Sequence, residues 1–462
     1  MDTATAVGTV QLPVAPVRRT APFDSLALES AYLAELGRLD GDAEARRAAD
    51  DLLVREGVRY HEGPVSWSYV PKIFSRADVA HLAWVAETMG GIMEKVTRAY
   101  AAREEVRRFF GLDPRIEELA RRLPAAGETI PIARVDIFLN EKTGAFQFCE
   151  LNTDGSSGML ATAGVTRANA LTGAGRRLTA SHAAAAFDVM GACADAVIDA
   201  YRAAGGEAEH PVFAVVDYIE SIAREEIAAF APVFEARGAR LHVADIRDLT
   251  YRDGRLADAD GPIDGVWRRV VVSEMLEKPC AGAGALMAAA EEGRVPVIGG
   301  FCTWPVATKT VFALLHDPLA ATMLSEEELA FVRDHVPETD LLDPESDLSR
   351  FHDRSRWIAK PRDGYNSSGV HAGSDCTEEE WQGILAEMAA TGGMVQAYAP
   401  QFASMNVEGG AAGVGRSPVP YDMMEGLYLF GGRFGGVFTR CGTQAVIGEF
   451  TDRLNMGCLV VS

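Results

Sequence analysis

Polar and apolar residues alternate along two neighbouring segments of the chain, residues 132–139 and 145–151. Such alternation is typical of β-strands with one buried face, and the polar residues 140–144 between them, which end in a glycine, predict a hairpin turn. In strict alternation, one face of this hairpin would carry six side chains: Arg134, Asp136 and Phe138 from the first strand, and Phe148, Glu150 and Asn152 from the second. The hairpin would therefore place two carboxylates and an amide between paired strands.

The polar side chains on this face have the chemistry of a metal site. Asp136, Glu150 and Asn152 would supply the oxygen ligands that a hard divalent cation such as Mg²⁺ prefers. Arg134 could offset negative charge on a substrate. The same pattern also fits an amphipathic hairpin whose charged face meets water. The glycine- and serine-rich segment 152–158 favours the functional interpretation, because polar loops that leave strands often carry function.

Upstream of the hairpin, apolar residues recur with helical spacing from about residue 26 to residue 122, most clearly over residues 76–110. An alanine-rich segment over residues 173–204 predicts one further packing helix. Residues 1–25 contain Pro, Thr and Ala without such a pattern, and they predict a disordered leader.

After residue 210 the pattern changes to short apolar runs. Four segments follow in the order strand, helix, strand, strand: 212–217, 219–237, 241–244 and 265–272. This order predicts a parallel α/β unit, and such sheets bind small molecules at the ends of their strands. Tyr218, Glu220 and Ser221 follow the first strand and are candidate substrate contacts. A helix N-cap role for Ser221 or Asp217 is the alternative.

The last third of the chain is dominated by strand patterns. The predicted strands are 356–360, 394–398, 427–430 and 434–440. Gly431 and Gly432 predict a tight hairpin turn between the last two. The glycine-rich segment 408–417 is interpreted as a flexible loop or the hinge of a lid.

Composition narrows the class of protein. A chain of 462 residues is long for one core, so several domains or subdomains are expected. The net charge of −22 argues against a nucleic-acid surface, although a few cations in one cavity could still bind a nucleotide. The seven cysteines are scattered and show no metal-binding spacing, which fits a reducing cytoplasm. We find no signal-peptide or membrane-spanning run, so a soluble, cytoplasmic protein without nucleic-acid or membrane partners is expected.

Several cations stand at the ends of predicted strands or helices. Lys360 ends a strand and precedes the glycine- and serine-rich segment 363–369, whose backbone N–H groups could hold phosphate oxygens. Lys309 begins a helix, where a cation opposes the helix dipole unless an anion binds nearby. Four arginines stand at comparable positions: Arg134, Arg268, Arg269 and Arg440. Surface salt bridges could explain any one of these cations, but together they favour a polyphosphate site.

In the order of these motifs, the chain resembles the ATP-grasp ligases of the glutathionylspermidine synthetase type and, more distantly, eukaryotic glutathione synthetase. The resemblance covers about residues 60–462. It rests on these short motifs: Arg134-x-Asp136, Glu150-x-Asn152, Trp267-Arg268-Arg269, Lys309, Lys360-Pro361 with its glycine loop, Val395-Gln396-Ala397-Tyr398, and Phe430-Gly431-Gly432 followed by Thr439-Arg440. In these ligases the metal-binding hairpin precedes the nucleotide lysines, a circular permutation of the usual ATP-grasp order, and this chain has that order.

The resemblance implies ATP and Mg²⁺ as cofactors and assigns a role to each motif. The implied metal ligands are Asp136, Glu150 and Asn152, and the implied catalytic residues are Arg134 and Arg440. The implied nucleotide contacts are Lys309, Lys360, Asp363, Gly364, Ser367, Ser368, Gly369, Gln396 and Tyr398. The implied substrate contacts are Ser156, Ser157, Tyr218, Glu220, Ser221, Arg268 and Arg269. At Asp363 the relatives carry a longer loop with a glutamate, so a metal contact there does not follow from the match.

The resulting expectation for the fold is a mixed α/β (α+β) protein. It would comprise a leader (1–25), a helical N-terminal region (26–125), the metal-binding hairpin with an α/β substrate subdomain (126–280), and a permuted ATP-grasp nucleotide-binding module (281–462).

The resemblance implies an ATP-dependent ligase that joins a carboxylate to an amine through an acyl phosphate, with ADP and phosphate released. We expect a glutamyl-type carboxylate and a small amino acid as substrates, because Arg268 or Arg269 could bind the amino acid's carboxylate. A polyamine acceptor, as in glutathionylspermidine synthetase, is an alternative, but it would need an acidic channel, for which the segment offers Asp217 and Glu220. A nucleotide-binding module without catalysis is a second alternative. The sequence predicts no oligomeric state.

Overall fold

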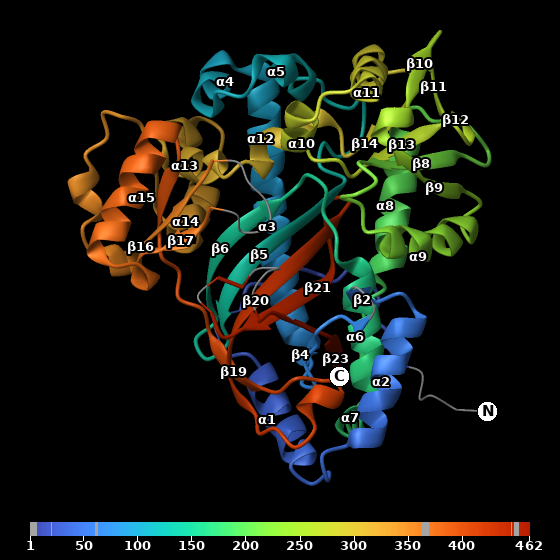
Figure 1. Ribbon diagram of the computed structural model, residues 1–462, viewed down its shortest axis with the longest axis vertical. Helices are drawn as coiled ribbons and strands as arrows, with labels where there is room; N and C mark the ends of the chain where they lie inside the picture. Colours follow the sequence, from blue (N-terminus) through green and yellow to red (C-terminus); the bar gives the residue numbers. More distant parts are fainter. Residues whose placement is uncertain (1–6, 20, 61–62, 363–368, 445, 448–451) are drawn as a thin grey trace.

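The computed structural model describes residues 7–19, 21–60, 63–362, 369–444, 446–447 and 452–462. An antiparallel sheet of six strands crosses the middle of the molecule (Figure 1). Its strands are β22 (Leu454–Met456), β21 (Arg433–Gly442), β20 (Val419–Phe430), β5 (Ile132–Asn140) and β6 (Ala145–Asn152), with β19 (Ala403–Asn406) paired to β20. The two predicted hairpins are confirmed, and Gly431 and Gly432 form the tight turn with φ angles of 56° and 72°.

The register between β5 and β6 changes the predicted alternation at one position. Asp136 pairs with Glu150, whereas Ile137 pairs with Phe148. Cys149 is therefore the additional residue of a β-bulge, a local irregularity that re-aims the side chains around it. Glu150 stays on the face of Asp136, but the prediction that Phe148 shares this face by strict alternation was wrong.

The longest helix, α3 (Arg76–Ala102), packs against β20 and β21 on one side of the central sheet. A capping box formed by Ser75 and Asp78 fixes its first turn. The remaining helices of the N-terminal half are α1 (Ser25–Leu36), α2 (Ala43–Arg55), α4 (Glu104–Phe110), α5 (Pro114–Ala120), α6 (Met159–Leu171), α7 (Gly173–Ser181) and α8 (Val189–Ala203).

The single helix predicted over residues 173–204 is two helices, α7 and α8, separated by the short strand β7 (Ala185–Ala186). The run of alanines hides this break because alanine carries little pattern. Asp188 begins α8 by accepting a hydrogen bond from the N–H of Gly191.

Residues 7–19 and 21–25, which were predicted to belong to a disordered leader, are ordered. β1 (Gly8–Thr9) joins a second sheet with β7, β23 (Cys458–Val461) and β4 (Lys72–Ser75). Arg19 forms an ion pair with the buried Asp78 at 2.7 Å, and Phe23 lies in the core. These long-range contacts have no local sequence signal. Residues 1–6 and 20 lie outside the described residues.

The predicted α/β unit is confirmed as a parallel sheet on the right of Figure 1, in the order β14 (Val297–Ile298), β13 (Gly265–Arg268), β8 (Val212–Asp217) and β9 (Arg240–Asp245). The helix that follows β8 is α9 (Arg224–Glu235), which is shorter than predicted. β13 ends at Arg268 rather than at residue 272, where α10 (Val272–Glu277) begins. A small sheet of β10 (Thr250–Arg252), β11 (Arg255–Asp258) and β12 (Gly261–Ile263) extends this unit, and α11 (Ala281–Glu292) follows it.

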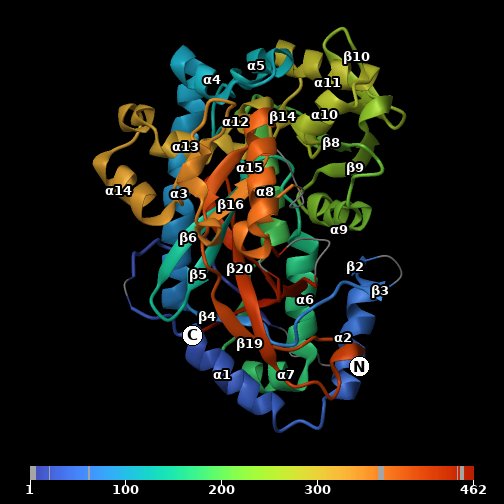
Figure 2. The ribbon, with the colours of Figure 1, turned by 60° about the vertical axis from the view of Figure 1, so that its left-hand side comes forward.

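A third unit lies to the left in Figure 1. Its antiparallel sheet has the order β15 (Thr339–Leu341), β18 (Met394–Ala397), β16 (Trp357–Lys360) and β17 (His371–Ala372). Figure 2 shows α15 (Glu378–Thr391) beside these strands. The short α12 (Trp304–Ala307), α13 (Thr310–His316) and α14 (Glu326–His335) connect this sheet to the rest of the molecule. The predicted fold class, a mixed α/β protein, is confirmed.

The glycine-rich segment that begins at residue 408 is fixed to α2. The guanidinium of Arg46 donates to the carbonyls of Glu408 and Gly409 at 2.5 and 2.9 Å, and Gly409 packs so closely on Trp67 that a Cβ would not fit. These contacts fix the first residues of segment 408–417, and the interpretation of the whole segment as a flexible loop or lid hinge stays a prediction. The second predicted lid segment, residues 363–368, lies outside the described residues.

A cluster of buried charges lies on the side of the central sheet that faces β4 and α1. The ammonium of Lys72 lies 2.9 Å from Glu141, 3.1 Å from Glu29 and 4.0 Å from Glu425, and all four side chains are buried. One cation thus faces three carboxyl groups in a medium of low polarity. Desolvation makes three negative charges there unfavourable, so proton uptake by the carboxyl groups is expected.

Stability should therefore fall as pH rises. Burial raises the pKa of Glu29 to about 7 and that of Glu425 to about 8, above the value of about 4.3 in an unfolded chain. Between about pH 5 and pH 8 the folded protein binds more protons than the unfolded chain, so the free energy of unfolding decreases by up to about 1.4 kcal/mol per pH unit for each carboxyl group. Glu425→Gln should reduce this slope, measured by urea unfolding at several pH values, while the exposed Glu327→Gln should not. Equal slopes for Glu425→Gln and the wild type would contradict this assignment.

Candidate functional site

A cavity of about 100 Å³ lies between the central sheet and the sheet that contains β16 and β18. Six side chains predicted from the sequence line it: Glu150, Lys309, Lys360, Gln396, Tyr398 and Arg440. Apolar residues complete the wall: Phe138, Phe148, Ile358, Val370, Met424, Val446 and Ile447. The structure therefore brings together cations that lie up to 131 positions apart in the sequence, Lys309 and Arg440.

Lys360 is a buried cation at the end of β16. Burial, together with the positive charge of Lys309, lowers the pKa of its ammonium to about 8. Lys309 lies at the start of α13, where its backbone N–H donates to the carbonyl of Arg362 at 2.8 Å. A second charge of the same sign beside a desolvated cation is unfavourable, so an anionic ligand would stabilise this pair.

Glu150 and Asn152 place oxygen donors beside these cations. Within the part of the chain that the structure describes, no hydrogen bond or ion pair reaches the carboxylate of Glu150, which is half-buried. The amide nitrogen of Asn152 is buried and has no partner among the described residues. Buried polar groups are normally satisfied, so the amide nitrogen of Asn152, which is a donor, indicates a missing acceptor.

Asp136 lies opposite Glu150 and is held between two arginines. Arg134 binds its carboxylate in a bidentate manner, with Nε–Oδ1 and Nη2–Oδ2 distances of 2.7 and 3.0 Å. Arg440 donates to Oδ2 at 2.8 Å. Asp136 is fully buried, and its negative charge orders both guanidinium groups.

The three oxygen-bearing residues fit a magnesium ion chemically. The carboxylate of Glu150 has no partner among the described residues, and a carboxylate such as Asp136 keeps lone pairs beyond those that its arginines use. Carboxylate and amide oxygens are the ligands that Mg²⁺ prefers.

Two residues that shape this site were not predicted from the sequence. The ring of Phe438 lies under both guanidinium groups, 4.9 Å from that of Arg134 and 5.2 Å from that of Arg440. Gly426 on β20 lies opposite Asp136 on β5, and a Cβ at Gly426 would lie 2.7 Å from the side chain of Arg134. A signal existed for each: Phe438 is two residues from Arg440 on one strand, and a glycine inside a long buried strand often marks a close approach.

The loop after β6 connects the central sheet to the α/β unit. The carbonyl of Ser157 accepts hydrogen bonds from Arg134 and from the hydroxyl of Tyr428, both at 3.1 Å. Ser156 donates to the carbonyl of Asn152 at 2.7 Å. The two serines thus lie beside the arginine pair, although neither lines the cavity.

At the edge of the α/β unit, the two predicted arginines differ. Arg268 donates to three backbone carbonyls, of Gly299, Gly300 and Val270, and pairs with Asp154, so its donors are used within the protein. Arg269 pairs with Glu226 at 3.2 Å, and its buried Nε has no partner among the described residues.

The other predicted substrate contacts bind protein groups. Ser221 donates to Glu274 at 2.7 Å, Glu220 is exposed and pairs with Arg247 at 2.6 Å, and the hydroxyl of Tyr218 donates to the carbonyl of Lys278. None of these side chains lines the cavity.

The predicted phosphate-binding loop lies mostly outside the described residues, which exclude Asp363, Gly364, Ser367 and Ser368. Gly369 is described. Its φ of 68° is in the left-handed region that favours glycine, and it packs near Pro361.

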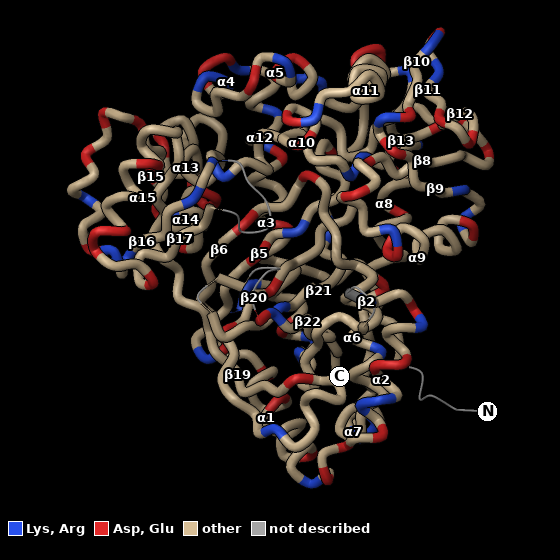
Figure 3. The backbone as a smooth tube through the Cα atoms, in the orientation of Figure 1, with Lys and Arg blue, Asp and Glu red and all other residues tan. Residues whose placement is uncertain are grey.

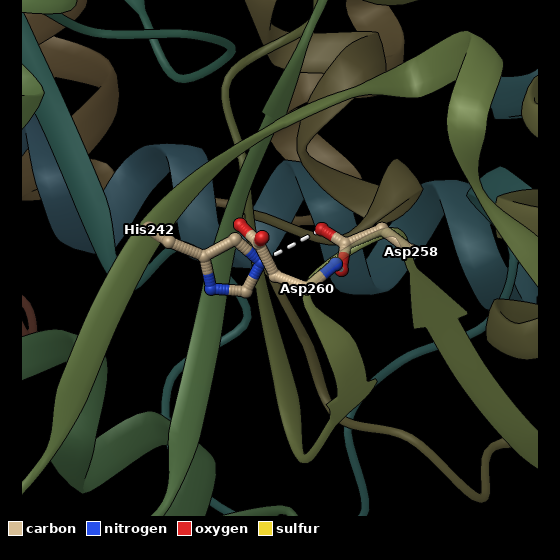
Figure 4. Close-up of side chains that lie close together, drawn as sticks. All are labelled: His242, Asp258 and Asp260. Atoms are coloured by element: carbon tan, nitrogen blue, oxygen red, sulfur yellow. Dashed lines mark hydrogen bonds and ion pairs between the residues drawn. The ribbon is translucent and has the colours of Figure 1, made fainter.

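A second group of potential metal ligands lies at the surface of the α/β unit (Figure 4). His242, Asp258 and Asp260 each place one ligand atom within 4.8 Å of the others. Both carboxylate oxygens of Asp258 already have partners within the protein: one pairs with His242 at 2.7 Å, and the other accepts a hydrogen bond from the N–H of Asp260 at 2.9 Å. Acidic and basic positions are interspersed throughout the fold (Figure 3), so a surface pair of this kind is unremarkable here.

The described residues contain no helix that is long and apolar enough to cross a membrane. No protein-family model matches the chain, and no curated protein sequence matches it.

The fold is similar to that of a glutathione synthetase-like effector from Globodera pallida in its apo form, with a TM-score of 0.62 and 12% sequence identity over 96% of this chain and 100% of that chain. A candidate γ-glutamylcysteine synthetase from Methylobacillus flagellatus KT matches at a TM-score of 0.42 and 11% identity, over 77% of this chain and 83% of that chain. A RimK-domain ATP-grasp protein from Sphaerobacter thermophilus matches at a TM-score of 0.29 and 14% sequence identity, over 54% of this chain and 90% of that chain. At these identities the first likeness shows the fold alone: the chain has the fold of a glutathione synthetase-like protein.

Proposed function

We propose that the protein is an ATP-dependent carboxylate–amine ligase of the ATP-grasp class. The observation that carries the proposal is the cavity that Lys309, Lys360 and Arg440 line together with Glu150, whose carboxylate has no partner among the described residues. Cations beside a metal-binding carboxylate are what a nucleotide triphosphate with its metal requires. The likeness of the fold to a glutathione synthetase-like protein supports this assignment.

The reaction joins a carboxylate to an amine through an acyl phosphate. The substrate's carboxylate oxygen attacks the γ-phosphorus of ATP, and ADP leaves. The amine nitrogen then attacks the carbonyl carbon, loses a proton and expels phosphate, so that the products are amide, ADP and phosphate.

The residues around the cavity suit the charges of these steps. Lys309 and Lys360 would neutralise the nucleotide phosphates, and Arg440 and Arg134 would stabilise the negative charge that develops on the transferring phosphoryl group and on the tetrahedral carbon. Glu150, Asn152 and Asp136 would hold Mg²⁺, which would supply further charge neutralisation when bound. The apolar wall keeps water from the acyl phosphate.

We propose that a glutamyl-type carboxylate and a small amino acid are the substrates. Arg269, whose buried Nε has no partner within the described part of the chain, is the better candidate for an amino acid's carboxylate, because the donors of Arg268 are used by backbone carbonyls and Asp154. Asp217 lies close enough for Arg269 to lower its pKa, although burial raises that pKa to about 6. A polyamine acceptor would need more acidic groups than Asp217 and the exposed Glu220.

ATP-dependent phosphate release should occur when carboxylate and amine are both present, and it can be measured with malachite green. Mass spectrometry of the products from ATP, Mg²⁺, glutamate and mixed amino acids should show a dipeptide. A parallel reaction with glutathione and spermidine is the comparison. Product in the second reaction alone would overturn the dipeptide assignment, and background phosphate with every substrate pair would overturn the ligase assignment.

A nucleotide-binding module without catalysis is the second candidate. Glu150→Ala distinguishes the two, because it removes a metal ligand and should abolish turnover under the ligase proposal. A wild-type protein that binds ATP and never turns over would favour the binding module.

A further inference from the structure

A chain of buried hydrogen bonds runs from the backbone to Lys360. The hydroxyl of Thr339 donates to the carbonyl of Pro337 at 2.9 Å. The amide nitrogen of Gln396 donates to the hydroxyl of Thr339 at 3.0 Å, and the ammonium of Lys360 donates to the amide oxygen of Gln396 at 2.8 Å. All three side chains are at most 7% exposed.

The strand register places these side chains on one face of the sheet. Thr339 on β15 lies directly opposite Gln396 on β18, and Gln396 lies opposite Ile358 on β16. Lys360 is two residues after Ile358 and therefore points to the same side. Such diagonal neighbours on adjacent strands are within reach of long side chains.

The two end groups of this series of hydrogen bonds, the carbonyl of Pro337 and the ammonium of Lys360, fix the direction of each bond. The carbonyl of Pro337 can only accept, so it takes the hydroxyl proton of Thr339. The ammonium of Lys360 can only donate, so it requires the amide oxygen of Gln396. If the amide were rotated, its N–H₂ group would face the ammonium, and two donors would meet.

We propose that Thr339 and Gln396 are positioning residues, which hold the ammonium of Lys360 toward the nucleotide cavity. This inference rests on the proposed nucleotide site. It changes the role of Gln396, which the sequence resemblance assigned to direct contact with the nucleotide: both ends of its amide are used by Thr339 and Lys360. An ammonium has three donors, so a single bond to Gln396 leaves others for phosphate oxygens.

The hydrogen bond to Gln396 matters because it restricts the position of the Lys360 ammonium. A lysine side chain is flexible, and its cost of immobilisation is high. A neutral amide oxygen can direct the ammonium without cancelling its charge, whereas a carboxylate at the same place would compete with the phosphate. The amide therefore suits a lysine that must bind an anion.

The test is the dissociation constant for MgATP, measured by isothermal titration calorimetry on the full chain. Thr339→Val and Gln396→Met should each raise it about 10-fold, because Gln396→Met removes the acceptor of the ammonium and Thr339→Val removes the hydroxyl that fixes that acceptor. Thr339→Ser keeps the hydroxyl and should stay within about 3-fold of the wild type. Thr391→Val is the control, since its hydroxyl bonds to the carbonyl of Glu387 on the surface of α15.

The double variant separates positioning from general loss of structure. If Thr339 acts through Gln396, Thr339→Val should have little further effect on the dissociation constant in the Gln396→Met background. Thermal unfolding of each variant reports any loss of fold separately. Single variants that bind MgATP like the wild type, or two effects that simply multiply, would overturn the inference and leave the proposed function standing. A wild-type protein that does not bind MgATP would overturn both.

Discussion

Replacing Arg440 with alanine is expected to lower kcat for ATP-dependent phosphate release by about 10²-fold or more, with little change in KM for ATP. Arg440 lines the cavity. Its guanidinium donates to Asp136 at 2.8 Å and lies over the ring of Phe438. A pre-oriented cation stabilises charge that develops in the transition state more than it stabilises the bound substrate.

Arg433→Ala is the matched control for this variant. Arg433 lies on the same strand, β21, but its side chain is 61% exposed and pairs with Glu87 at 3.0 Å. Its replacement should leave kcat within about 2-fold, as for an ordinary surface ion pair. Arg440→Lys should recover part of the activity, because it restores the charge without the planar fork that reaches both Asp136 and a ligand. Nearly unchanged activity in Arg440→Ala would remove this arginine from the site.

The part of the site that lies on one hairpin could be predicted because its signal is local. Alternation over residues 132–151 placed Asp136 and Glu150 on one face of the hairpin, and the structure agrees, because the two residues pair. The bulge at Cys149 could not be predicted, because nothing in the alternation of residues 145–152 marks one residue as additional. It nevertheless decides that Phe148 pairs with Ile137.

Partners that are distant in the sequence limited the prediction of individual roles. Arg268 and Arg269 look equivalent at the end of a strand, but the carbonyls of Gly299 and Gly300 use the donors of Arg268. Likewise, Gln396 lies 57 positions from Thr339, and only the pairing of β15 with β18 brings them together. Backbone carbonyls and non-local strand pairs have no signature in a single sequence.

The buried position of Lys72 was also not evident, and it leads to the largest expected change in stability. Lys72→Met should lower the free energy of unfolding at pH 7 by about 3–5 kcal/mol, because removal of one partner leaves buried carboxylates without compensation. Lys72 is surrounded by Glu29, Glu141 and Glu425, and its side chain is fully buried. Burial opposes its charge, but the three carboxyl groups raise its pKa, so it remains protonated.

Lys95→Met is the control, since Lys95 is 46% exposed and pairs with Glu328 at 2.6 Å. Its cost should not exceed about 1 kcal/mol. The penalty of Lys72→Met should shrink toward pH 5, where Glu29 and Glu425 are protonated in the folded protein and no longer need a cation, and it should be smaller when Glu141, the nearest partner, is also replaced by glutamine. A penalty below 1 kcal/mol at pH 7, or one that does not change with pH, would show that the three carboxyl groups do not depend on Lys72.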